Sequence, residues 1–255
     1  MRGVRFAGLA AAMLLTSLAG AGGSVAAASA VHPRPLTVPA IEQWYHGSGK
    51  WQLGPNARIL VWPKRAGTLM LGRQLSADLR HVIHRSLPVA ARRDGYRAGD
   101  VILHRSNDLS RRLGDEGYAL EVSRFVRVTA PTSAGLFYGG RSLIQLLHQA
   151  ASIPRGFGLD SPRYPERGLM VDASRTTYTT KWMLREIRRL AALKLNVLHL
   201  HLTDDQRWGI ESRSFPALAS KGAFSRADIA RILRLAHRDH VTVIPEIEMP
   251  GHLAA

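Results

Sequence analysis

From residue 167 to its end, the chain alternates short apolar stretches with amphipathic ones, and this alternation limits the fold more than any other feature. The apolar stretches fit three β-strands, at 168–172, 196–202 and 241–247. Between them, apolar residues recur at helical spacing over 180–195, with Thr180 as the helix cap, and over 225–236. Strands that alternate with helices form a parallel sheet, either open or closed into a barrel. We therefore predict an α/β fold, in which residues 164–255 are the first three β/α units of a (β/α)8 TIM barrel.

The length of this region bears on how much of the barrel is present. A complete barrel takes about 250 residues, or roughly 30 for each unit. Only 89 residues follow Glu166, which is enough for about three units. We therefore expect the sequence to be the N-terminal, incomplete part of such a barrel and the front part of a longer protein.

The region before the barrel mixes strand and helix patterns over 41–150, which predicts a small α/β domain. Its clearest elements are a helix with apolar residues every four positions at Leu71, Leu75, Leu79 and Ile83, a strand pair at 118–122 and 125–129, and a helix capped by Thr132. Residues 151–163 contain Pro, Gly and Ser and are predicted to be a linker to the barrel.

Residues 1–30 have the pattern of a signal peptide. Two arginines precede an uncharged apolar stretch over 6–18, and a triplet of small residues ends at Ala30. The apolar stretch is too short to span a bilayer, which takes roughly 20 residues. We expect cleavage near Ala30, a mobile Pro-rich leader at 31–40, and a secreted or periplasmic protein with no stable membrane anchor. An uncleaved N-terminal anchor is the alternative.

The composition excludes several chemistries. The chain has no cysteine, which rules out disulfides, thiolate metal sites and a cysteine nucleophile. Its formal net charge is +16, and 30 of its 35 basic residues are arginine, so a polyanionic partner has to be considered. The arginines are scattered, with no run longer than two. A solvated basic surface is therefore the favoured interpretation, and we predict no nucleic-acid partner.

Polar side chains gather where each of the three predicted barrel strands ends. The clusters are Asp172–Arg175, His199–Gln206 and Glu246–His252. In a parallel α/β sheet, active sites form at the carboxyl ends of the strands. The sequence therefore predicts one polar site at this edge of the sheet.

Within these clusters, Arg175 lies beside one acid and faces two more on the next strand, so we interpret it as a fixed donor for substrate hydroxyls rather than a surface arginine. Asp204 and Asp205 are adjacent, and one is expected to cap a turn while the other binds a ligand. Glu246 and Glu248 share a face of the strand and need cationic partners wherever they are buried.

The histidines admit more than one interpretation. His199 and His201 point to one face of their strand, and a hydrogen-bonded core pair is favoured over a catalytic role. With Asp204 or Asp205 they also have a superficial likeness to the ligands of metal-dependent hydrolases, but a His-x-His pair is a weak signal. We therefore predict no metal and no cofactor. We also predict that His252 forms a hydrogen-bonded bridge to Asp204.

Several segments together carry a resemblance to a known family. They are RGLMVDASR (167–175), KLNVLHLHLTDDQ (194–206), FPALASKGAFSRADI (215–229) and VTVIPEIEMPGH (241–252), with GDEGYALEVS (114–123) and TAPTSAGLFYGGRSLIQLL (129–147) upstream. In these segments the chain resembles the family-20 glycoside hydrolases, the β-N-acetylhexosaminidases, including the small domain that precedes their barrel. The resemblance covers nearly everything from Leu36 onward.

The resemblance implies a retaining hydrolase that removes terminal β-linked N-acetylglucosamine or N-acetylgalactosamine. In this family the nucleophile is the substrate's own 2-acetamido oxygen, which an Asp orients, while the neighbouring Glu is the acid and base. That pair ends the fourth barrel strand of the family, so it is expected beyond Ala255 and no catalytic residue is assigned in this chain. The 255-residue chain alone is therefore expected to be inactive. The implied partner is an oligosaccharide or glycoconjugate with a terminal N-acetylhexosamine, and the oligomeric state is left open.

The resemblance also implies roles for four residues. Arg175 matches the family arginine that holds sugar hydroxyls in the terminal subsite, and Asp204 matches an aspartate that binds the same sugar. His252 matches a histidine linked to that aspartate and toward the acid/base Glu, and Glu248 matches an acid that supports this network.

Two departures from the family pattern lie near the substrate. Thr176 stands where the family often has His, and Arg207-Trp208-Gly209 stands where it commonly reads Gly-Trp-Arg. Both bear on the shape of the subsite and on the preference for the leaving group.

Two functions other than glycoside hydrolysis are also compatible with parts of the sequence. A non-catalytic carbohydrate-binding protein on a degenerate barrel would keep the polar edge but lack the Asp-Glu pair in the next strand. A polyanion-binding protein would use the basic surface. Retention on heparin that is lost at moderate salt would show only nonspecific electrostatic binding.

Overall fold

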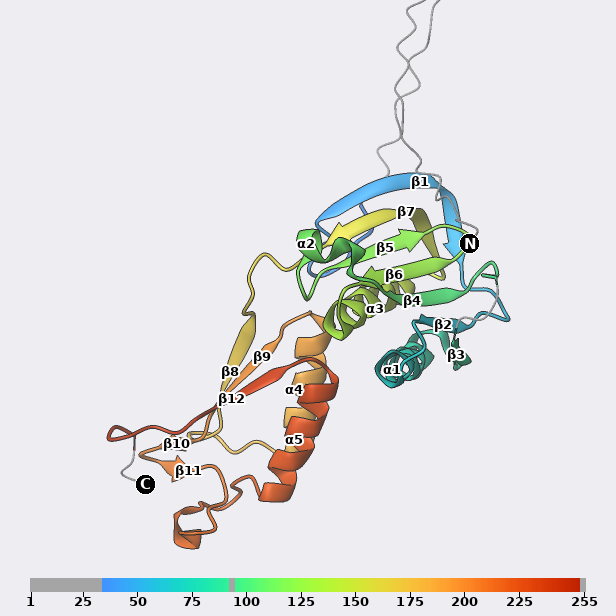
Figure 1. Cartoon of the computed structure of the whole chain (residues 1–255). Helices are drawn as coiled ribbons and strands as arrows, with labels where there is room; N and C mark the ends of the chain where they lie inside the picture. The colour runs from blue at the N-terminus through green and yellow to red at the C-terminus, as the bar shows by residue number, and fades with distance from the viewer. Residues whose placement is uncertain (1–33, 92–94, 253–255) are drawn as a thin grey trace, which may run out of the picture. The chain divides into compact units, whose positions relative to one another are not determined.

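The computed structural model describes residues 34–91 and 95–252. The predicted signal peptide at 1–30 lies outside these residues, as do the first three residues of the predicted leader. The described chain forms a seven-stranded mixed sheet, a three-stranded parallel sheet and a two-stranded ribbon (Figure 1). No helix in the described part of the chain has the length and apolar character needed to cross a membrane.

The seven-stranded sheet has the strand order β1-β7-β5-β6-β4-β2-β3. Its strands are β1 (Gln43–Gln52), β2 (Ile59–Trp62), β3 (Val89–Ala91), β4 (Val101–Arg105), β5 (Tyr118–Val122), β6 (Val126–Ala130) and β7 (Ser152–Asp160). Pairing is antiparallel from β1 through β7 and β5 to β6, and parallel from β6 through β4 and β2 to β3. The predicted strand pair is thus present as β5 and β6.

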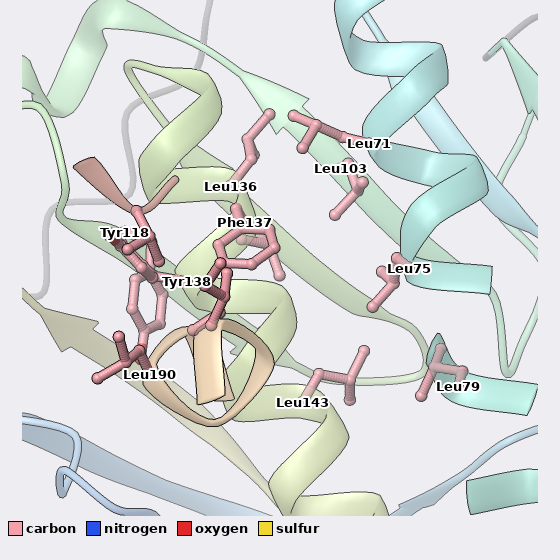
Figure 2. Close-up of a cluster of buried hydrophobic side chains, with 14 of the residues drawn as sticks. Leu71, Leu75, Leu79, Leu103, Tyr118, Leu136, Phe137, Tyr138, Leu143 and Leu190 are labelled. Atoms are coloured by element: carbon pink, nitrogen blue, oxygen red, sulfur yellow. The ribbon is translucent and has the colours of Figure 1, made fainter. Parts of the chain in front are cut away.

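Two helices, α1 (Ala66–Ile83) and α3 (Ser133–Gln149), pack together against this sheet (Figure 2). The predicted stripe of α1 is buried at Leu71, Leu75 and Leu79, and each buried leucine contributes about 2 kcal/mol. Thr132 caps α3 as predicted, because its hydroxyl oxygen accepts a hydrogen bond from the amide of Gly135 at 3.2 Å. A short helix, α2 (Ser110–Leu113), follows the 3-10 turn Asn107–Leu109.

The predicted linker at 151–163 is wrong over most of its length, because Ser152–Asp160 form β7 in the middle of the antiparallel strands. Pro and Gly residues are typical of loops, which is why the sequence predicts a linker, but Gly156 is needed for packing against Trp44. A Cβ at Gly156 would lie 2.6 Å from Cζ2 of Trp44 and 2.5 Å from the carbonyl oxygen of Tyr45. Glycine therefore lets the indole ring of Trp44 lie directly on the strand.

The prediction of a mobile leader does not fit residues 34–40, which α3 holds in place. The amide of Val38 donates to Oε1 of Gln145 at 2.7 Å, and Nε2 of Gln145 donates to the carbonyl of Val38 at 2.8 Å. Thr37 is buried, and its hydroxyl accepts a hydrogen bond from the amide of Ile41 at 3.1 Å. Side-chain bonds to both polar groups of one residue fix this segment on the helix.

The rest of the chain has the predicted parallel β/α order. Its elements are β8 (Gly168–Asp172), α4 (Thr180–Ala192), β9 (Val197–His201), β10 (Thr203–Asp204), β11 (Arg207–Trp208), the 3-10 turn Pro216–Leu218, α5 (Arg226–Arg238) and β12 (Thr242–Glu246). The parallel strands have the order β12-β9-β8, and α4 and α5 lie side by side against them (Figure 1). The cap of α4 is Thr179 rather than the predicted Thr180, whose hydroxyl instead donates to Asp228 at 2.6 Å.

Candidate functional site

The carboxyl ends of β8, β9 and β12 are level with one another. Asp172, at the end of β8, is in register with His201 at the end of β9, and Glu246 at the end of β12 is in register with the same His201. The polar clusters that follow these strands therefore meet at one edge of the sheet, as the strand order predicts.

The first cluster is a turn fixed by the carboxylate of Asp172. Its Oδ1 accepts hydrogen bonds from the amide and hydroxyl of Ser174, at 3.1 and 2.6 Å, and from the amide of Arg175, at 2.9 Å. Burial disfavours the charge of Asp172, but the hydrogen bonds from Ser174 and Arg175 outweigh it and hold the pKa of this carboxyl well below its usual range. A charged Asp172 thus fixes the backbone that carries Arg175.

Arg175 bridges two carboxylates from neighbouring strands. Its Nη1 donates to Oδ2 of Asp172 at 2.7 Å, and its Nη2 contacts Oδ2 of Asp204. The hydrogen bond to Asp172, helped by the attraction of both carboxylates, raises the pKa of Arg175. Asp204 has a side chain only 4% exposed, whereas that of Arg175 is 42% exposed. The pair therefore presents a permanent cationic donor fork in front of a buried carboxylate.

Two histidines face the same oxygen of Asp204. Nδ1 of His252 lies 2.9 Å from Oδ2 of Asp204, and Nε2 of His201 lies 3.7 Å from it. This oxygen forms no hydrogen bond, and at 3.7 Å the contact with His201 is also too long for one, so both are close polar contacts. The predicted bridge between His252 and Asp204 is therefore present as a close contact without hydrogen-bond geometry.

The carboxylate of Glu246 contacts both histidines of β9. Its Oε2 is 2.7 Å from Nε2 of His199 and 3.0 Å from Nδ1 of His201. A hydrogen bond with Glu248, followed by that from His201, lowers the pKa of Glu246. His201 is buried and fits the predicted core role, but the side chain of His199 is 41% exposed and does not. The amide of Glu248 donates to the hydroxyl of Thr203 at 3.0 Å, which places this acid beside the network.

Two groups of these side chains have the spacing to hold a metal ion, namely His201 with Glu246 and Glu248, and Asp204 with Asp205 and His252. In the first group, Oε2 of Glu246 is already in contact with two imidazole nitrogens. In the second, the guanidinium of Arg175 lies against Asp204 and would repel a cation. The donor set therefore fits an arginine-centred hydroxyl site better than a metal site.

The sequence did not predict the ribbon formed by β10 and β11. In this ribbon Asp204 is directly opposite Arg207, and Thr203 is opposite Trp208. The available signal was the Asp-Gln turn at 205–206, because aspartate favours tight turns. The ribbon adds Arg207 to the residues that stand at this edge.

A parallel β/α sheet with such a cluster at its carboxyl edge is the arrangement found in (β/α)-barrel enzymes. Residues 164–255 match the family described as "Glycosyl hydrolase family 20, catalytic domain", and residues 34–160 match "Glycosyl hydrolase family 20, domain 2". The chain belongs to glycosyl hydrolase family 20, as its sequence motifs imply.

Individual relatives agree with this assignment. The chain is 30% identical over 223 residues to a Lacto-N-biosidase of Bifidobacterium bifidum, which covers 86% of this chain and 19% of that protein. It is 30% identical over 263 residues to Beta-hexosaminidase 1 of Coccidioides posadasii, covering 89% and 43%.

Among solved structures, it is similar to a mutant Streptomyces plicatus beta-hexosaminidase in complex with product (GlcNAc). The TM-score is 0.77 at 32% identity, and the match covers 87% of this chain and 47% of that one. The GH20 beta-N-acetylhexosaminidase of Streptomyces coelicolor A3(2) gives a TM-score of 0.77 at 31% identity, covering 87% and 48%. The chain thus spans less than half the length of each of these relatives.

Proposed function

We propose that the full-length protein removes terminal β-linked N-acetylhexosamine from oligosaccharides or glycoconjugates, and that the edge described above is part of its terminal-sugar subsite. The observation that carries this proposal is the contact of Arg175, an exposed cationic fork, with the buried carboxylate of Asp204. A guanidinium donates to sugar hydroxyl oxygens, and a carboxylate accepts from hydroxyl protons. The pair therefore supplies both functions that a polyhydroxylated ring requires.

His252 and Glu248 complete the subsite in this proposal. The imidazole of His252 is 43% exposed and contacts Asp204. His252 follows β12 and Arg175 follows β8, so the two side chains come from strands on opposite sides of β9. One buried carboxylate thus orients two exposed donors, which lowers the entropy lost when a sugar binds. We assign Glu248 a supporting role, because it stands beside Glu246 and Thr203 rather than at the exposed surface.

The reaction proposed is retaining and substrate-assisted, with the 2-acetamido oxygen of the sugar as the nucleophile. The Asp that orients this group and the acid/base Glu are proposed to follow residue 255 in the full-length protein. The role left for the residues described is to bind and orient the ring, so that the acetamido group stands in line with the bond to be broken.

The test is hydrolysis by the full-length polypeptide of p-nitrophenyl β-N-acetylglucosaminide, with p-nitrophenyl β-glucoside as the matched control. The two substrates differ at carbon 2, where the glucoside has no acetamido group. Turnover of the first alone, with the β-anomer released first as followed by NMR, supports the proposal. Equal turnover of both substrates would contradict acetamido participation, and binding of the sugar without turnover would favour the non-catalytic carbohydrate-binding protein.

We also propose that the protein is exported, on the basis of the charged, apolar and small-residue regions of 1–30. Expression of the complete gene followed by N-terminal sequencing of the exported protein tests this. A mature N-terminus directly after Ala30 supports the proposal, and a protein retained in the cytoplasm with Met1 intact contradicts it.

A further inference from the structure

The Arg-Trp-Gly segment at 207–209, where this chain departs from the pattern that the resemblance implies, contacts the loop that carries Arg175. We propose that Arg207 is a positioning residue, which clamps the loop on both sides of Arg175 and thereby sets the affinity for the terminal sugar. This inference rests on the proposed function, because it assumes that Arg175 binds the sugar.

The guanidinium of Arg207 donates to three backbone carbonyls. Nη1 donates to the carbonyl oxygen of Ala173 at 3.0 Å and to that of Thr176 at 3.3 Å. Nη2 donates to the carbonyl oxygen of Lys221, in the segment that leads to α5, at 3.1 Å. Ala173 and Thr176 flank Arg175 in the sequence, so one side chain holds the Arg175 loop before and after the sugar-binding residue.

The ribbon gives this clamp a direct link to the subsite. Asp204 and Arg207 are opposite each other across β10 and β11. Asp204 contacts the guanidinium of Arg175, while Arg207 holds the backbone around it. The side chain and the backbone of the same loop are therefore fixed by the two members of one cross-strand pair.

The backbone of Gly209 packs against the same loop. A Cβ at Gly209 would lie 2.7 Å from the carbonyl oxygen of Ala173 and 3.0 Å from that of Leu202. The amide of Gly209 also donates to the carbonyl of Leu202 at 2.7 Å. This close approach brings Ala173 within reach of Arg207, so the Arg and the Gly of the sequence act together.

Arginine is required at 207 for a geometric reason. Its planar group presents five N–H donors in fixed directions, and three of these directions are used here for carbonyls of two separate segments. A lysine ammonium is a point donor that cannot satisfy the same three acceptors. A chain with glycine at this position has no side chain to make these bonds. The clamp therefore depends on the arginine at position 207.

The test compares Arg207→Lys with wild type in the full-length enzyme, using p-nitrophenyl β-N-acetylglucosaminide. Because the substitution loosens the loop that carries a charged hydrogen-bond donor to the sugar, we expect KM to rise about tenfold. Arg175 is proposed to hold the sugar in the ground state and in the transition state alike, so we expect kcat to change less than about threefold. The matched control is Arg85→Lys, because the Arg85 guanidinium also donates to two backbone carbonyls, of Pro55 and Gly54, but far from the edge.

A double-mutant cycle shows whether Arg207 acts through Arg175. In an Arg175→Lys background, Arg207→Lys is expected to add less than about a twofold change in KM, because the group it positions is already lost. If Arg207→Lys raises KM by the same factor with and without Arg175, the inference is overturned, because the effect of Arg207 is then independent of Arg175. An unchanged KM in the single variant would overturn it as well. Should Arg207→Lys fail to fold, Arg207→Gln is measured in its place, with the same expectations.

The outcomes separate this inference from the proposed function. A wild-type enzyme that does not hydrolyse the substrate overturns the proposed function and the inference with it. An active wild-type enzyme whose Arg207 variants bind and turn over the substrate normally overturns the positioning role alone.

Discussion

Arg175 and His252 follow the two outer strands of the three-stranded sheet, and both contact one carboxylate oxygen, Oδ2 of Asp204, which follows the central strand. Asp204 has a side chain 4% exposed, while those of Arg175 and His252 are 42% and 43% exposed. A single buried charge therefore holds two exposed donors that come from different loops. We therefore expect the proposed subsite to depend on this carboxylate more than on either donor.

The first prediction is the effect of Asp204→Asn, which keeps the size of the side chain and removes its charge. The carboxylate of Asp204 is proposed to accept hydrogen bonds from the sugar and it holds Arg175 in place. A hydrogen bond to a charged group is worth about 1.5–3 kcal/mol, and each 1.4 kcal/mol is about tenfold, so we expect kcat/KM of the full-length enzyme to fall by about ten- to a hundredfold. Asp205→Asn, at the exposed neighbouring residue, is the control. Equal losses in the two variants would mean that Asp204 has no special role.

The second prediction concerns Gly209→Ala. The new methyl group would meet the backbone of Ala173 and Leu202, neither of which can move without shifting a strand end or the Arg175 loop. We expect the free energy of unfolding to fall by about 1–3 kcal/mol and KM to rise. Gly67→Ala is the matched control, because a Cβ at Gly67, in α1, meets nothing within 4 Å. A Gly209→Ala protein as stable as the control would show that the two segments are not tightly packed.

A buried ion pair in the molecule gives the third prediction. Nζ of Lys194 donates to the hydroxyl of Tyr118 and to Oδ2 of Asp160, both at 2.8 Å, and the Tyr118 hydroxyl donates to the same Asp160 oxygen at 2.6 Å. Burial raises the pKa of Tyr118 and lowers that of Lys194. Lys194→Met leaves the Asp160 carboxylate buried without its cation, so we expect a loss of stability of about 3–5 kcal/mol in urea unfolding.

The control for Lys194 is Lys64→Met at an exposed lysine, which is expected to change stability by less than about 0.5 kcal/mol. Adding Asp160→Asn to Lys194→Met removes the uncompensated charge, and is expected to restore part of the loss. A double variant that is less stable than Lys194→Met would show that the cost does not come from the unpaired carboxylate.

The fourth prediction is a pH dependence of stability. The pKa of Asp172 lies below the value of about 3.9 that an unfolded aspartate has, so its charged form stabilises the fold above pH 4 or so. This contribution is lost as the pH falls below about 4 toward the pKa in the folded protein. Asp172→Asn is therefore expected to be less stable than wild type at pH 6, with a difference that shrinks toward pH 2. Asp108→Asn, at an exposed residue, is the control, and parallel stability curves for the two variants would contradict the prediction.

Particular residues show why the barrel part was predictable from the sequence. Met183, Ile187 and Leu190 recur at helical spacing and are buried on one face of α4. Helices cover one face of the three parallel strands, and the alternation of apolar strands with amphipathic helices predicts the parallel sheet and its common edge. The prediction that Arg175, Asp204 and His252 meet at that edge needed only this geometry, and their contacts agree with it.

Other features left no readable signal. β7 contains glycines that pack against Trp44, and because glycine is typical of loops, the sequence predicted a linker where the structure has a strand. Thr179 and Thr180 are equally suited to cap α4, so the sequence cannot choose between them. In the structure Thr179 is the cap, and the hydroxyl of Thr180 donates to Asp228 instead. The partners of Arg207 are backbone carbonyls, which every residue has, and the sequence therefore cannot identify them.

The most direct test of the account is a crystal structure of the full-length protein with N-acetylglucosamine bound. We predict that hydroxyl groups of the sugar lie within about 3 Å of the guanidinium of Arg175 and the carboxylate of Asp204, with His252 still against Asp204. A sugar bound at another place, or a structure in which these three side chains stand apart, would contradict it.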